Sequence, residues 1–208
     1  VSPDGSPLYT TKYGQKDPFG KATFTGVNGD GTLLLDITDS SALTGAADGR
    51  ITENVGDNIY DTTVSLESLK NKNYQFADGA TSKTFENTAS VTPADLTIQI
   101  GDASTVYGTK FDASQYGYNY VSGIKNGDTE ETLDAAFGGM NYTNDAALDG
   151  TDGKWTKKVG NYDLTGEGAN SLTNYNVTYL KGTATVTPYT ITEEEIVNPD
   201  GSPLYTTK

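Results

Sequence analysis

The sequence of 208 residues contains no cysteine and no histidine. Without these side chains the chain cannot build a disulfide framework, a Ser-His-Asp or Cys-His nucleophile, or a conventional zinc or haem site. A lack of cysteine is also compatible with export, where a free thiol is a liability. We therefore expect a chain that is not an enzyme, with no catalytic residue and no cofactor.

Positive charge is scarce as well. Lys and Arg together number 14 against 28 Asp and Glu, which gives a formal net charge of −14. This sign argues against binding to nucleic acid or to an anionic membrane surface. No apolar run approaches the length of a membrane span and no signal-peptide pattern is present, so we expect no membrane insertion and place any targeting signal outside this sequence.

The residues that are abundant favour β-structure. Glycine numbers 24, tyrosine 14 and phenylalanine 6, while only 34% of the residues are hydrophobic. Alternating Tyr, Thr and Phe between Gly-rich turns predicts an all-β protein with short, half-buried strands. In the first half we expect strands at 8–13, 22–27, 32–37, 59–66, 73–76 and 84–92, with no convincing helical period before residue 93.

An internal repeat defines the organisation of the chain. Residues 1–12 return at 197–208 with one difference, a serine at position 2 and an asparagine at position 198. The two copies lie 196 positions apart (197 minus 1). We interpret this spacing as one full period of a tandem array, with the start of the next copy included.

Within that period, five short landmarks occur twice in the same order. We interpret them as two domains on one strand plan, at 1–93 and 94–188, with 189–208 beginning the next copy and the first domain lacking its opening strand. The pairs are Tyr13-Gly14 with Tyr107-Gly108, Gly29-Asp30 with Gly127-Asp128, Val55-Gly56 with Val159-Gly160, Asn73-Tyr74 with Asn174-Tyr175, and Val91-Thr92-Pro93 with Val186-Thr187-Pro188.

These landmarks carry a family resemblance. The second half resembles the MBG repeat domain of large bacterial surface adhesins. The first half resembles the related YDG or MBG-like repeat, although it has Tyr-Gly where Tyr-Asp-Gly is usual. The resemblance implies an all-β fold class with two tandem immunoglobulin-like β-sandwich domains in an elongated arrangement.

The same resemblance implies a function. Such domains form the stalks of secreted or surface-anchored adhesins, so it implies an extracellular spacer whose partners are neighbouring repeats and a host or cell-surface glycan or protein. It carries no catalytic residue. The structural motif residues are Tyr13, Gly14, Gly56, Asn73, Tyr74, Tyr107, Gly108, Gly160, Asn174 and Tyr175. In each Asn-Tyr pair we expect the tyrosine to bury its ring and return its hydroxyl to the backbone, as in a tyrosine corner.

Two other functions stay open. A binding module could contact a glycan or protein through the 137–158 loop, which holds the sole tryptophan, Trp155, or through a face made by Tyr116, Tyr118 and Tyr120. Alternatively, arrays could associate with one another. We expect residues 189–196 to form an acidic strand, and such a strand could pair head to tail with the open sheet edge of another molecule.

Two further sites are compatible with the residue types present, a calcium site and an isopeptide bond. Asp145, Asp149 and Asp152 are spaced closely enough to suggest a calcium site, which requires six to eight oxygen ligands, but an ordinary acidic turn has the same composition. An isopeptide bond to Lys21, Lys83, Lys110 or Lys181 would need a buried lysine, and lysine is normally exposed.

Overall fold

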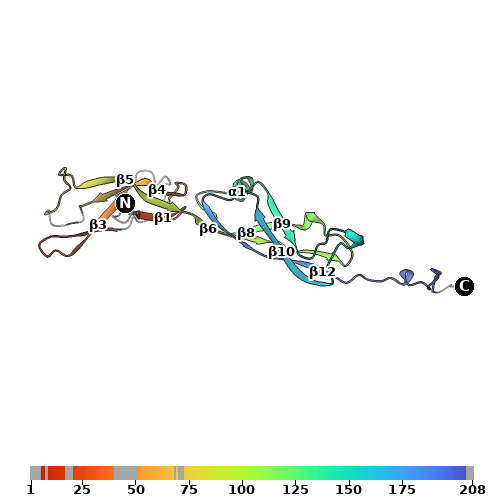
Figure 1. Ribbon diagram of the computed structural model, residues 1–208. Helices are drawn as coiled ribbons and strands as arrows, with labels where there is room; N and C mark the ends of the chain where they lie inside the picture. The colour runs from red at the N-terminus through yellow and green to blue at the C-terminus, as the bar shows by residue number, and fades with distance from the viewer. Residues whose placement is uncertain are drawn as a thin grey trace. The chain divides into compact units, whose positions relative to one another are not determined.

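The computed structural model describes residues 6–7, 9–16, 21–39, 51–67, 69 and 73–204. The chain is mostly β, so the all-β fold class is confirmed (Figure 1). Among the described residues no helix is long and apolar enough to span a membrane. The strands are β1 (Tyr9–Lys12), β2 (Lys21–Thr25), β3 (Thr32–Asp39), β4 (Gly56–Ser65), β5 (Ser82–Thr92), β6 (Ala94–Ile100), β7 (Ala103–Val106), β8 (Tyr118–Ser122), β9 (Met140–Asn144), β10 (Gly160–Gly168), β11 (Tyr175–Leu180) and β12 (Gly182–Thr187).

The first sheet has the strand order β1-β5-β4-β3-β2. Strand β1 runs parallel to β5, and the other neighbours are antiparallel. Alternation places Leu35, Val64 and Leu66 in a buried cluster, against which Phe24 and Phe85 pack. Five of the six strands expected in this half are therefore confirmed within the described residues, although Leu8 lies outside them.

The sixth expected strand, at 73–76, is wrong. Phe76 donates its backbone N–H to Ala80 and accepts one from Gly79, so the backbone closes a tight turn and does not extend. The apolar ring of Phe76 still contributes to the core, because it meets Phe85 edge-on at 6.3 Å between ring centroids.

Two further sheets are built from the second half. One has the order β7-β12-β10-β9, and the other has the order β11-β6-β8. In β6 the alternate residues Leu96, Ile98 and Ile100 are at most 1% exposed. Full burial of each such side chain contributes roughly 1.5–3 kcal/mol to stability.

One α-helix was not anticipated from the sequence. Helix α1 (Glu130–Phe137) begins with a capping box between Thr129 and Thr132, ends at Gly138 with φ +68°, and buries Leu133 and Phe137. Thr at the N-cap and Gly just past the end are ordinary helix signals. The segment 137–158, expected to be a loop, in addition contains strand β9, which pairs with β10.

The acidic strand expected at 189–196 is also wrong. A single turn of 3₁₀-helix, η3 (Glu193–Glu195), lies there instead. The carboxylate of Glu195 accepts hydrogen bonds from the backbone and side chain of Thr192, and this local cap competes with an extended backbone. Ile191 stays 68% exposed.

The chain divides into two compact units. Unit 1 comprises residues 1–97, 120–139 and 169–178, and unit 2 comprises 98–119, 140–168 and 179–208. Contacts between the first sheet and the segments 120–139 and 169–178 therefore lie inside unit 1. The domain limits expected at residues 93 and 188 stay a prediction.

Candidate functional site

Two turns with the same sequence pattern are the local structures around which the site is built. They are Val27-Asn28-Gly29-Asp30 and Lys125-Asn126-Gly127-Asp128. Each is closed by a backbone hydrogen bond from its aspartate N–H to the carbonyl of its first residue, at 3.1 and 2.9 Å. Both central residues have positive φ, +55° and +82° in the first turn and +55° and +80° in the second. This is the pattern of a type I′ turn, for which Asn-Gly is the preferred pair.

A tyrosine closes each turn from outside. The Tyr175 hydroxyl accepts the N–H of Lys125 at 2.9 Å and donates to the Asp128 carboxylate at 2.6 Å. The Tyr74 hydroxyl accepts the N–H of Val27 at 3.0 Å and donates to the Asp30 carboxylate. The chain therefore builds the same tyrosine-capped turn twice, from the Asn-Tyr pairs at 73–74 and 174–175.

The electrostatics of these tyrosines suit a structural contact. Burial, followed by the hydrogen bond to Asp128, raises the pKa of Tyr175 well above its usual value. At Tyr74 the hydrogen bond to Asp30 is the first cause of a raised pKa. Both hydroxyls therefore keep their protons and act as donors to a carboxylate, so neither is suited to proton transfer near neutral pH.

A third tyrosine joins only the second turn. Tyr13, directly after β1, meets the ring of Tyr175 edge-on, with centroids 5.5 Å apart and planes at 80°. Its hydroxyl donates to the same Asp128 oxygen at 3.2 Å. Tyr13 is 7% exposed and Tyr175 is 6% exposed. Burial, first, and the neighbouring Asp128 raise the pKa of Tyr13 as well.

Gly14 permits a close approach between the chain that follows β1 and the Lys125–Asp128 turn. Its φ is +69°, and a Cβ at this position would lie 2.4 Å from the Cβ of Lys125. Its N–H donates to the carbonyl of Ile51, and the same carbonyl accepts the side-chain amide of Asn126 at 2.7 Å. A side chain at position 14 would therefore push the Lys125–Asp128 turn away from the first sheet.

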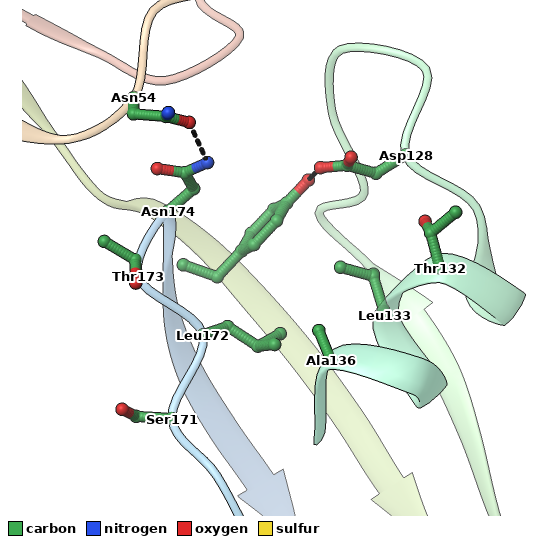
Figure 2. A pocket seen from close by; sticks show the side chains of 10 residues that line it. Asn54, Asp128, Thr132, Leu133, Ala136, Ser171, Leu172, Thr173 and Asn174 are labelled. Atoms are coloured by element: carbon green, nitrogen blue, oxygen red, sulfur yellow. Dashed lines mark hydrogen bonds between the residues drawn. The ribbon is translucent and has the colours of Figure 1, made fainter. Parts of the chain in front are cut away.

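Two asparagines complete the contact. Figure 2 shows Asn174 facing Asn54, and the Asn174 amide donates to the Asn54 side-chain oxygen at 2.8 Å. The Asn174 oxygen in turn accepts the backbone N–H of Val55 at 3.0 Å. We refer to the whole set as the tyrosine cluster; its members are Tyr13, Gly14, Asn54, Asn126, Asp128, Asn174 and Tyr175.

A groove of about 390 Å³ lies beside the tyrosine cluster. Figure 2 shows Leu133 and Ala136 of α1 on one side of it and Ser171, Leu172 and Thr173 on the other. Its lining contains one carboxylate, Asp128, which already accepts two tyrosine hydroxyls. The groove therefore offers amide and hydroxyl groups for binding, but no pair of groups arranged for acid–base or nucleophilic chemistry.

The other motif residues are not members of the tyrosine cluster. Tyr107 follows β7 and is 49% exposed. Gly108 has φ +83°, and nothing lies within 4 Å of where its Cβ would be. Gly56 and Gly160 open β4 and β10, and Asn73 is exposed beside Tyr74. Sequence reasoning did not identify Asp30 and Asp128 as the hydroxyl acceptors, although the repeated Asn-Gly-Asp triplet was a usable signal.

The acidic residues of the loop do not assemble into a metal site. In the part of the chain that the structure describes, no group of three or more acidic residues is placed to hold an ion, so Asp145, Asp149 and Asp152 are not brought together. Asp149 caps its own turn by accepting the Thr151 N–H at 2.8 Å, and its hydrogen bonds to Thr151 lower its pKa.

The aromatic residues considered for ligand binding are at least partly packed. The Trp155 ring covers Gly150, where a Cβ would lie 2.4 Å from ring atoms. Tyr116, Tyr118 and Tyr120 are half-buried. Asn144 donates to the Tyr116 hydroxyl, and the Tyr120 hydroxyl donates to Asp134. These contacts favour a structural role over an open stacking face.

The lysines considered for an isopeptide bond are not in a suitable environment where they can be described. Lys83, Lys110 and Lys181 are exposed, and Lys181 pairs with Asp163 at 2.5 Å. The side chain of Lys21 lies outside the described residues. A buried lysine, which the reaction requires, is absent at the three described positions.

Comparison with known proteins identifies the second half. Residues 96–185 match the family model of the MBG domain (YGX type). The matched span contains the triplet Tyr107-Gly108-Thr109, which fits the name of the type. The MBG-type domain expected here is confirmed, and the YDG-like assignment of the first half stays a prediction. No curated protein matches the chain.

The Tyr175→Phe variant tests the hydroxyl contact. We expect it to lower the free energy of unfolding by about 1–3 kcal/mol at pH 7, because Asp128 and the Lys125 N–H each lose a partner. In the wild type the pKa of Tyr175 is higher in the folded state than in the unfolded state, where it is about 10. The Tyr175 hydroxyl therefore contributes its full share of the free energy of unfolding below about pH 10, and this share declines as the pH rises further. The variant should therefore lose less stability than the wild type between about pH 9 and pH 11.

Urea unfolding across this pH range, at a dilution where the chain is monomeric, measures both effects. Tyr107→Phe is the matched control, since the Tyr107 ring is exposed in the single chain and its hydroxyl should leave the monomer's stability and pH dependence unchanged. Equal pH dependence in Tyr175→Phe and the wild type would show that this hydroxyl is not buried against a carboxylate.

Paired glycine variants test the close approach. Gly14→Ala and Gly108→Ala introduce the same Cβ at positive φ, but only the first would meet another residue. We expect both to cost about 1 kcal/mol from backbone strain, and Gly14→Ala to cost about 1–3 kcal/mol more from overpacking. Denaturant unfolding gives the difference, and equal losses would contradict the close contact at Lys125.

Proposed function

Because residues 96–185 are an MBG domain of the YGX type, we propose that the chain is a structural repeat of a secreted or surface-anchored bacterial adhesin. In this role it is an extracellular spacer that projects an adhesive region away from the cell. The proposed architecture is a pair of tandem immunoglobulin-like β-sandwiches in each repeat.

The tyrosine cluster is the observation that carries this proposal. It fastens the first sheet to the Lys125–Asp128 turn and to Asn174-Tyr175, which belong to the matched MBG span. Strand β5 ends at Thr92 and β6 begins at Ala94, so only Pro93 separates them. A proline with a fixed φ and several directional hydrogen bonds suit a joint that transmits load.

The chemistry of the chain supports a passive role. The groove beside the tyrosine cluster lacks a catalytic pair, and a net charge of −14 favours solubility and mutual repulsion of the stalks. A module that binds a host or cell-surface glycan or protein is the alternative. The packing of Trp155 and of the three tyrosines at 116–120 gives that alternative less support.

Association between copies through residues 189–196 is part of the proposal. Tyr189-Thr190-Ile191 matches Leu96-Thr97-Ile98 of β6. Leu96 and Ile98 are fully buried, whereas Tyr189 is 52% and Ile191 68% exposed. Strand β2 lies at an edge of the first sheet, and an edge of this kind accepts an added strand. The tail would become extended on docking, because burial of its apolar side chains then outweighs the local cap at Glu195.

Small-angle X-ray scattering tests the spacer role. We expect the wild-type profile to fit one arrangement and to stay the same with calcium and with a chelator. Asp128→Ala, which removes the acceptor of two hydroxyls, should give a broader distribution of distances while circular dichroism stays that of a folded β-protein. Asp149→Ala is the matched control. A wild-type profile that needs a broad ensemble, or that changes on chelation, would contradict a stiff, metal-independent spacer.

Sedimentation equilibrium at increasing concentration tests the tail. Ile191→Asp should shift the average mass toward the monomer, because a charge would replace the apolar group that docks. Thr190→Asp places the same charge on the opposite side of the extended segment and should have less effect. A wild type that remains monomeric at every concentration, or equal effects of the two variants, would count against docking of this segment.

A further inference from the structure

The surface at Tyr107 and Gly108 repeats the one at Tyr13 and Gly14. Strand β7 runs parallel to β12 in the register Val106↔Thr187, and β1 runs parallel to β5 in the register Lys12↔Thr92. The N–H of Tyr107 then donates to Thr187 at 2.9 Å, and the N–H of Tyr13 donates to Thr92 at 3.0 Å. Both glycines have positive φ. The two dipeptides are therefore presented by the same local backbone.

The two surfaces differ in what covers them. Tyr13 is 7% exposed and Tyr107 is 49% exposed. Gly14 is pressed against Lys125, whereas the space beside Gly108 is open. Val159, which corresponds to Val55, is 51% exposed. A shallow hollow of about 290 Å³ lies between Tyr107, Lys158 and Val159.

The first sheet carries a turn that matches this open surface. The Val27–Asp30 turn has the backbone of the Lys125–Asp128 turn, and Tyr74 caps it as Tyr175 caps the other. Val27, which stands in the place of Lys125, is 62% exposed. Asp30 already accepts the Tyr74 hydroxyl, and a carboxylate can accept further donors, as Asp128 does from Tyr13.

We propose that a second copy of this chain docks its Val27–Asp30 turn and Tyr74 on the surface formed by Tyr107, Gly108, Lys158 and Val159. The inference rests on the proposed function in one respect, that the docked copy is the next repeat of the array. The same contact would then recur between each repeat and the next one along the array.

The contacts of the tyrosine cluster specify this interface residue by residue. The Tyr107 hydroxyl donates to Asp30 of the second copy, and its ring packs edge-on against Tyr74. Val27 passes over Gly108, where a Cβ would obstruct it as at Gly14. Asn73 lies against Val159 and Lys158, as Asn174 lies against Val55 and Asn54.

Cysteine trapping tests the interface cleanly, because the chain has no cysteine of its own. Asn73→Cys and Lys158→Cys chains are mixed under mild oxidation and separated on non-reducing gels, with a small mass tag on one of them. We expect disulfide-linked heterodimers in excess of either homodimer. A mixture of Asn73→Cys with Glu167→Cys, another exposed position, gives the background of random collisions.

A second substitution addresses specificity. Tyr107→Ala in the Lys158→Cys chain should reduce the heterodimer to that background, while Trp155 fluorescence and circular dichroism report an unchanged fold. A heterodimer yield equal to the background in the unsubstituted pair, or a yield that Tyr107→Ala leaves intact, would overturn the proposed docking surface.

A pair of cysteines within one chain distinguishes failure of the proposed docking from failure of the proposed function. Asn54→Cys and Asn174→Cys in one chain occupy the corresponding positions of the tyrosine cluster and should form a disulfide within the monomer. If this pair forms and the Asn73–Lys158 pair does not, the joint inside the chain stands and docking between copies fails. If the internal pair fails to form, the spacer proposal itself loses its basis.

Discussion

The hydrogen bond from a tyrosine hydroxyl to the aspartate that ends an Asn-Gly-Asp turn is the contact on which unit 1 depends. The turn needs positive φ at its asparagine, a conformation that a non-glycine residue adopts at some cost. Tyr74 and Tyr175 offset that cost, because each hydroxyl accepts the N–H of the first turn residue and donates to the aspartate. Burial of the Tyr175 ring makes its hydrogen bonds stronger than they would be in water.

At the Lys125–Asp128 turn the same hydrogen bond is part of a larger contact, which links the turn to the end of β1. Tyr13 adds its hydroxyl to Asp128 and its ring to Tyr175, and Gly14 lets the backbones approach. The asparagine pair at 54 and 174 adds hydrogen bonds that need both partners in register. Directional polar contacts together with two buried rings fix the orientation of the turn against the end of β1.

A chain without cysteine must hold its parts together by other means. Here the apolar contribution comes from small clusters, such as Leu35, Val64 and Leu66 with the rings around them, and from the buried face of β6. The polar contribution comes from the capped turns. Both contributions come from side chains of the chain itself.

The sequence by itself determined the β class, most strands of the first half and the MBG-type domain, because alternation, turn residues and repeated landmarks are local patterns. It also singled out the Asn-Tyr pairs and Tyr13-Gly14. It did not reveal that Asp128 receives two tyrosines, that Asn54 meets Asn174, or that Tyr13 is buried while Tyr107 is open. Helix α1, with its short apolar face, and the capped turn at Glu193–Glu195 were likewise missed. Only the tertiary structure decided these points, because they depend on which segments, distant in the sequence, come together. The identical dipeptides Tyr13-Gly14 and Tyr107-Gly108 do not themselves indicate which of them is covered by another part of the chain.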